Sequence, residues 1–220
     1  QPILQFFRGV LLATEILVTV VAFTMLGLIE AHAIFAIYPL IVAAFSGPIL
    51  GETVGWRRWV AIGVGFIGML IILQPGLKVF SPHALIAVGG AVLFALYNLL
   101  TRLAASKDTA ATSFFWTGIG GFVIMTVIGP FFWEPMSPID FRWMALLCVT
   151  GATGHFLLIK AYEKAEASIV QPFAYLQLVF ASMIGVTVFG ENLPLPTSVG
   201  AGLIVMSGIF TLWREKKAKV

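Results

Sequence analysis

The chain alternates long windows free of Asp, Glu, Lys and Arg with short polar turns. Seven windows contain none of these residues, and an eighth is interrupted only by Glu15. The windows are residues 9–29, 31–51, 59–77, 79–101, 109–133, 143–159, 167–190 and 192–213. Each has 17 to 25 residues, and about 20 helical residues cross a hydrocarbon layer of about 30 Å. The pattern predicts an all-α polytopic membrane protein with eight transmembrane helices embedded in a lipid bilayer.

Composition and charge agree with this prediction. Of the 220 residues, 60% are hydrophobic and 10% charged, whereas soluble domains average about 25% charged. With the first end inside, 11 of the 13 Lys and Arg residues fall on one side, and only Lys78 and Arg142 on the other. The positive-inside rule then places both termini in the cytoplasm. Because topology accounts for the basic residues, we do not expect nucleic-acid binding.

No enzymatic constellation is found in the sequence. His32, His83 and His155 fall at different membrane depths, and no zinc ligand set, Ser/His/Asp arrangement or phosphate loop is present. The run from Gly63 to Gly68 matches a dinucleotide fingerprint, but it lies in the middle of an apolar window. We therefore expect neither an enzyme nor a bound cofactor or metal.

A weak internal repeat is more informative. The segment 39–52 is similar to 178–191; each ends in Gly-Glu, and a glycine follows 11 residues after the Glu. The first copy ends in a loop on the basic side and the second in a loop on the opposite side. Copies that run in opposite directions are the architecture of many secondary transporters.

The same motifs resemble the EamA-type transporters of the drug/metabolite transporter superfamily. The resemblance rests on Phe7-Arg8-Gly, the Leu-Gly-Glu52 end with Arg57-Arg58, and Gln74-Pro-Gly in the first half. In the second half it rests on Gly151-x-x-Gly-His155, Ala161-Tyr162, the run from Ala167 to Tyr175, and Phe189-Gly-Glu191.

The family resemblance implies a ten-helix fold of five plus five inverted helices. Residues 1–80 would form three helices of the first repeat, and residues 81–220 the five helices of the second repeat with a basic cytoplasmic tail. The first two helices of the family pattern have no counterpart here. We therefore expect that residues 1–220 alone do not transport and that exposed packing faces favour homo-oligomers. The resemblance also implies the inner membrane of a bacterium.

Polar residues within the windows are candidates for a substrate site, because ionisable groups are costly in a membrane. By helical rise, four of them on four different helices lie at one membrane depth, namely Glu15, Asn98, His155 and Tyr175. Glu15 and His155 are the titratable pair among these four, which suggests protons as a coupling ion. Each has a structural alternative, namely packing or a backbone hydrogen bond, and for Glu15 an interfacial pair with Arg8. Tyr38 and Gln171 are further candidates because they lie beside Pro39 and Pro172. Trp116 is a candidate because it lies deeper in its window than the other tryptophans. The predicted substrate-binding residues are Glu15, Tyr38, Asn98, Trp116, His155, Gln171 and Tyr175.

Two functions remain open from the sequence. The first is a secondary active transporter that moves a small metabolite, such as an amino acid or a related polar or amphipathic compound, by alternating access. The alternative is a truncated, non-transporting membrane protein or packing subunit. Glu52 and Glu191 are interpreted as structural turn residues.

Overall fold

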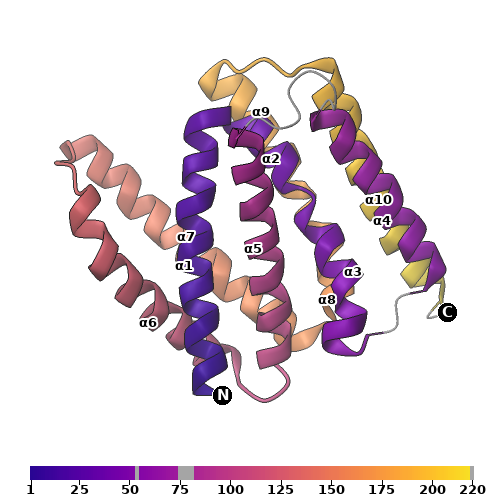
Figure 1. Cartoon of the computed structure of the whole chain (residues 1–220), viewed down its shortest axis with the longest axis horizontal. Helices are drawn as coiled ribbons and strands as arrows, with labels where there is room; N and C mark the ends of the chain where they lie inside the picture. The colour runs from indigo at the N-terminus through magenta and orange to yellow at the C-terminus, as the bar shows by residue number, and fades with distance from the viewer. Residues whose placement is uncertain (53–54, 74–81, 219–220) are drawn as a thin grey trace. The chain divides into compact units, whose positions relative to one another are not determined.

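A computed structural model describes residues 1–52, 55–73 and 82–218, and these residues are almost entirely helical (Figure 1). This confirms the all-α prediction. The helices are α1 (Pro2–Leu26), α2 (Leu28–Phe35), α3 (Tyr38–Leu50), α4 (Trp56–Leu73), α5 (Pro82–Ala104), α6 (Ala110–Ile128), α7 (Pro138–Lys164), α8 (Ala167–Ala174), α9 (Leu176–Phe189) and α10 (Leu195–Ala218). A short 3-10 helix, η1 (Gly129–Phe132), follows α6.

Six helical segments are long and apolar enough to cross a membrane. They are Pro2–Leu26, Leu28–Leu50, His83–Ala104, Ala110–Phe132, Pro138–Lys164 and Ile169–Phe189. Two shorter apolar helices, Trp59–Ile72 and Leu195–Phe210, occupy the remaining predicted windows. The count of eight crossing helices therefore stays a prediction. The predicted domain boundary between residues 80 and 81 lies outside the described residues.

The chain forms two compact units. The first unit consists of residues 1–14 and 100–165. It contains the start of α1, the end of α5, and the pair α6 and α7, which pack on each other. Phe114 on α6 and Phe156 on α7 meet edge to face with ring centroids 5.3 Å apart. Where α1 crosses α6, a Cβ added at Gly120 would lie 2.7 Å from the Gly9 Cα, so the two backbones are in direct contact.

The second unit consists of residues 15–99 and 166–220. Within it α4 runs beside α10 (Figure 1), while α2 packs on α9 and α3 packs on α8. Since α2 leads into α3 and α8 leads into α9, this pairing makes the two segments antiparallel. The start of each segment therefore lies beside the end of the other.

Both segments are kinked rather than interrupted. The first bends at Ala36 and Ile37, with Pro39 two residues farther on near the start of α3. The second bends at Tyr175, three residues after Pro172. The backbone at both bends stays in the right-handed helical region, which lets the chain continue across. Each bend lies within three residues of one of the two prolines that adjoin candidate site residues.

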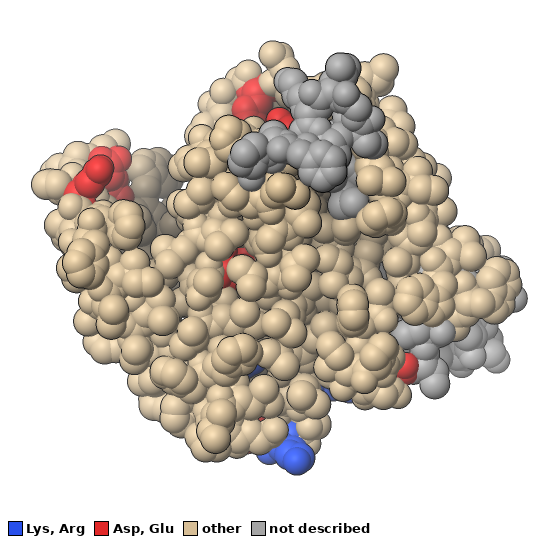
Figure 2. Space-filling view, in the orientation of Figure 1, with Lys and Arg blue, Asp and Glu red and all other residues tan. Residues whose placement is uncertain are grey.

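The surface suits contact with lipid. Most large side chains on α7 are exposed and apolar, including Leu146, Leu147 and Val149, and the only buried residues of that helix are Ile159 and Tyr162. Figure 2 shows few charged side chains on the face in view. An apolar exterior of this kind is stable in hydrocarbon and unfavourable in water.

Candidate functional site

The seven predicted site residues are divided between the two units. Glu15, Tyr38, Asn98, Gln171 and Tyr175 belong to the second unit, while Trp116 and His155 belong to the first. The predicted common layer therefore draws its residues from both units, and its common depth stays a prediction. Whether His155 shares a cavity with the residues of the second unit stays a prediction.

Glu15 is buried inside α1, with 4% of its surface exposed. Its carboxylate accepts a hydrogen bond of 2.6 Å from Thr19, one turn farther along the same helix. Burying a carboxyl group in an apolar helix has a free-energy cost, so such a group is a candidate for a functional role. The role of Glu15 in a substrate site stays a prediction, and Thr19 is a partner that the sequence reasoning missed.

Tyr38 and Tyr175 lie at the two kinks, and both are buried. The Tyr175 and Ser207 side chains are hydrogen bonded, so the ring is fixed against α10. Tyr38 is close enough to interact electrostatically with Glu15, and Tyr175 with Tyr38. Together, Glu15, Tyr38, Tyr175 and Ser207 form a buried polar row through the second unit, hereafter called the polar row.

A small residue on α10 makes room for Tyr175. A Cβ added at Gly208 would overlap the Cδ2 and Cε2 atoms of the Tyr175 ring. We expect Gly208→Ala to displace the ring and lower the free energy of unfolding by about 1–3 kcal/mol, as overpacked positions do. Gly202→Ala on the same helix is the matched control, since a Cβ there meets nothing within 4 Å. Titration with SDS in mixed micelles measures the free energy of unfolding of both variants. Equal values for Gly208→Ala and Gly202→Ala would contradict the tight contact between Gly208 and the Tyr175 ring.

The two amide side chains differ in what the structure shows. Asn98, 1% exposed, donates from Nδ2 to the Phe94 carbonyl 2.6 Å away, one turn earlier in its own helix. The structural alternative for this residue, a bond to a backbone carbonyl, is thus present on α5 itself. Gln171 is buried on α8, four residues before the kink at Tyr175.

An aromatic cluster adjoins the polar row, and most of it was missed from the sequence. Phe94 packs edge to face on Tyr38 with centroids 4.7 Å apart, and Phe35 lies 5.1 Å from Tyr38 and 5.4 Å from Phe94. Tyr97 stacks on Phe94 at 5.9 Å. The spacing Phe35/Tyr38 and Phe94/Tyr97, three residues apart on each helix, was the available signal.

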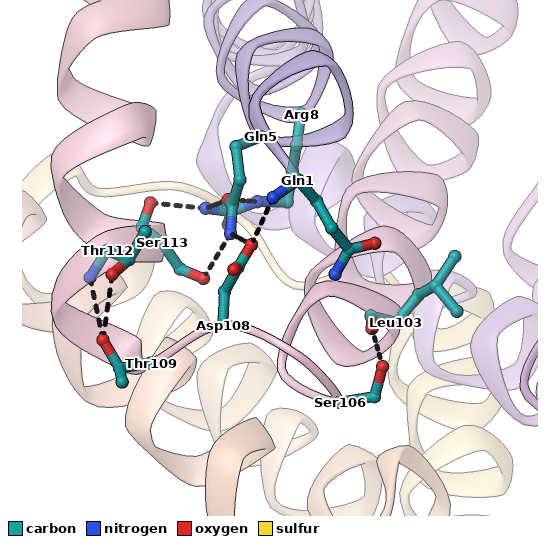
Figure 3. A network of polar contacts seen from close by, with 9 residues as sticks. All are labelled: Gln1, Gln5, Arg8, Leu103, Ser106, Asp108, Thr109, Thr112 and Ser113. Carbon is teal, nitrogen blue, oxygen red and sulfur yellow. Dashed lines mark hydrogen bonds and ion pairs between the residues drawn. The ribbon is translucent and has the colours of Figure 1, made fainter.

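In the first unit the main polar feature is a buried guanidinium, that of Arg8, which the sequence had suggested mainly as a topological charge. Arg8 is 0% exposed and donates to Thr101 at 3.1 Å and to Thr117 at 2.8 Å. It also donates to Gln5 and to the Ser113 carbonyl, both of which are drawn in Figure 3. Gln5 and Arg8 are three residues apart on α1, and Ser113 and Thr117 are four apart on α6, so each pair shares a helix face. This spacing was the signal that could have found the network.

A loop carboxylate extends the network. Gln5 donates from Nε2 to Asp108 at 2.8 Å and to the Ser113 hydroxyl at 2.9 Å. The hydrogen bond from Gln5, aided by the positive charge of Arg8, holds the pKa of Asp108 below its ordinary value despite some desolvation. Asp108 therefore stabilises this end of the unit as a carboxylate, and that contribution is lost when the pH falls through the lowered pKa.

His155 and Trp116 also belong to the first unit. His155 is half-buried on α7, near enough to Arg8 for the two to interact electrostatically. Trp116 is half-buried on α6 next to Phe115, and its carbonyl faces Gly9 on α1. Among the described residues, no group of three or more His, Cys, Asp or Glu side chains is placed to hold a metal ion.

The two loop glutamates do more than form turns. Glu191 accepts hydrogen bonds from the backbone amides of Leu28 and Ile29, at 2.7 and 2.8 Å, and so caps α2. Glu52 accepts one from the amide of Ala167, at 3.1 Å, and so caps α8. A pocket of about 250 Å³ adjoins Glu191 and is lined also by Glu30, Asn192 and Thr197.

Comparison with known proteins identifies the class of this membrane protein. Residues 81–213 match the model of the EamA-like transporter family. Over 221 aligned residues the chain is 28% identical to an S-adenosylmethionine uptake transporter of Rickettsia prowazekii, covering 99% of this chain and 74% of that relative.

Two further relatives carry other transport names. A riboflavin transporter of Vibrio cholerae is 34% identical over 200 residues, covering 86% of this chain and 64% of the relative. A pseudopaline exporter of Pseudomonas aeruginosa is 24% identical over 212 residues, covering 96% and 74%. Together with the family match, which spans more than half of the residues, these similarities show that the chain belongs to the EamA-like transporter family of the drug/metabolite transporter superfamily.

Proposed function

We propose that the protein is a secondary active transporter that moves a small polar or amphipathic metabolite, such as an amino-acid derivative, across the membrane. The observation that carries this proposal is the polar row inside the second unit. Glu15 and the hydroxyls of Tyr38, Tyr175 and Ser207 lie within apolar helices, where burying polar groups has a free-energy cost that a substrate site explains.

The position of the polar row supports the same function. Tyr38 and Tyr175 stand at the kinks of two antiparallel segments, α2–α3 and α8–α9. In many secondary transporters the substrate binds where such discontinuous helices meet near the bilayer midplane. We propose that Asn98, Gln171, Trp116 and His155 are substrate-binding residues as well.

The substrate class follows from the chemistry of these groups and from the relatives. The Glu15 carboxyl suits an amino group or another cation, and the rings of Phe35, Tyr38 and Phe94 suit a planar or cationic partner. Named relatives take up S-adenosylmethionine or transport riboflavin. We therefore propose a metabolite that joins a polar or cationic group to an unsaturated ring or amino-acid moiety.

We further propose alternating access between two inverted repeats, one within residues 1–80 and one within residues 81–220. The helix bounds support this repeat: α2, α4 and the end of α3 recur 139 positions later as α8, α10 and the end of α9. The antiparallel pairing of α2–α3 with α8–α9 is the arrangement expected of inverted copies.

The proposed orientation, in a bacterial inner membrane with eight spans, puts both termini in the cytoplasm. It rests on the 11 to 2 division of basic residues between the two sides. In a Cys148→Ser background, single cysteines at Ser137 and Asn192 are expected to react with an impermeant maleimide in intact cells, whereas one at Lys107 is expected to stay unlabelled. The reverse labelling pattern would contradict this orientation.

A binding experiment tests the proposed substrate class. Purified protein is heated with increasing amounts of S-adenosylmethionine, riboflavin or single amino acids, because a ligand that binds the folded state raises the melting temperature by mass action. We expect saturable stabilisation by at least one of these classes, and its weakening in Tyr175→Ala. Trp143→Ala, at an exposed position on α7, is the control and should bind as wild type does. No stabilisation by any member of the panel would contradict the proposed class.

A further inference from the structure

Two helices of the second unit end in the same way. After α3 and α9, Gly51 and Gly190 take left-handed conformations with φ of 70° and 65°. The next amide then bonds back to a carbonyl six residues earlier: Glu52 to Ser46 at 3.3 Å and Glu191 to Gly185 at 2.9 Å. This is the Schellman ending, which needs a residue that tolerates positive φ and turns the following side chain away from its own helix.

Each glutamate reaches the start of the other kinked segment. The Glu191 latch is the pair of bonds from the Leu28 and Ile29 amides to the Glu191 carboxylate, and the Glu52 latch is the bond from the Ala167 amide to Glu52. The first amides of a helix have no partner within the helix and carry its positive dipole end. A carboxylate there forms charge-assisted hydrogen bonds that are stronger than neutral ones.

The two latches lie at opposite ends of the paired segments. Glu191 follows α9 and binds the start of α2, whereas Glu52 follows α3 and binds the start of α8. The segment Leu28–Leu50 between them has 23 residues, which corresponds to about 34 Å of helix, close to the hydrocarbon thickness of a bilayer. One latch therefore lies near each membrane surface.

We propose that Glu52 and Glu191 are reciprocal positioning residues that hold the two ends of the transport path closed. This inference rests on the proposed alternating access. Both latches are made in this structure, so α2–α3 and α8–α9 are fastened to each other at both ends. If one segment rocks against the other about the central kinks, one latch must separate while the opposite latch stays closed.

The proposal predicts mirrored effects of two matched substitutions. Glu191→Gln and Glu52→Gln keep the side-chain size but remove the charge that strengthens the amide bonds. Each is expected to increase the ratio of open to closed molecules at its own end by about tenfold, the effect of weakening a hydrogen bond to a charged group. The opposite end should stay closed.

Distances between spin labels report this directly on the whole protein in nanodiscs without substrate. In a Cys148→Ser background, labels at Met25 and Leu195 report the Glu191 end, and labels at Ile49 and Phe173 report the Glu52 end; all four positions are exposed. Glu191→Gln should lengthen only the first distance and Glu52→Gln only the second. Glu30→Gln, in the same pocket as Glu191, makes the same charge change and should leave both distances as in wild type.

The outcomes separate the latches from transport itself. Unchanged distances in both variants, or equal broadening at both ends in each variant, would overturn the latch proposal whether or not the protein transports. Mirrored changes in a protein that takes up no substrate would support the latches and leave only the transport function refuted. Glu191→Asp, which keeps the charge but shortens the reach, should give a smaller shift at the same end than Glu191→Gln.

Discussion

Replacing Arg8 with methionine is expected to lower the free energy of unfolding of the first unit by about 3 kcal/mol or more. The guanidinium is fully buried and binds oxygens of Gln5, Thr101 and Thr117 and the Ser113 carbonyl. An apolar side chain of similar length fills the space but removes the donors to Gln5 Oε1 and to the Thr101 and Thr117 hydroxyls. Each buried polar group left unsatisfied costs about 1–3 kcal/mol. Titration with SDS in mixed micelles measures the loss.

Two further variants define the cause of that loss. Arg8→Lys keeps the charge but replaces the planar fork by a single ammonium, so we expect an intermediate stability. Arg142→Met removes an exposed positive charge on α7 and should leave the stability close to wild type. If Arg8→Met is as stable as Arg142→Met, the network in Figure 3 does not hold the unit together.

In the protein from its native gene, replacing Glu15 with glutamine is expected to abolish the stimulation of uptake by an imposed pH gradient. Substrate exchange should continue, with weaker binding of a cationic substrate. Glutamine still accepts the hydrogen bond from Thr19 but cannot bind and release a proton. The carboxyl is the titratable group of the polar row best suited to proton coupling, since tyrosine hydroxyls ordinarily lose their protons only near pH 10. Uptake into proteoliposomes, with and without the gradient, measures the change.

The retained exchange shows that the Glu15→Gln protein is folded, and Glu30→Gln, at an exposed carboxylate near the membrane surface, is the matched control. His155→Ala tests the second predicted member of the titratable pair. Gradient-driven uptake equal to wild type in both Glu15→Gln and His155→Ala would make these residues packing elements and remove protons as the coupling ion.

The sequence predicted the features that depend on local pattern. Apolar windows located the helices, and Pro39 and Pro172 lie beside the two bends. These succeed because helix formation and proline geometry are set by neighbouring residues. The family motifs also led to the correct family, since their glycines and turns recur at fixed spacings.

The features that depend on distant partners were missed. Arg8 was counted as a topological charge because its partners Thr101, Ser113 and Thr117 are about a hundred residues away along the chain. Glu191 was interpreted as a turn residue because the amides that it caps lie 162 and 163 residues earlier. A single sequence shows which residues are polar, but it does not show which helices bring them together.

The most direct test of the account is saturable uptake by the protein from its native gene, reconstituted in proteoliposomes. Labelled S-adenosylmethionine, riboflavin and amino acids are offered to wild type, to Tyr175→Ala and to empty liposomes. The account predicts that wild type takes up at least one of these compounds with saturation and that Tyr175→Ala needs more substrate for half-maximal uptake. Entry that is linear in concentration and equal to that of empty liposomes for every compound would contradict it.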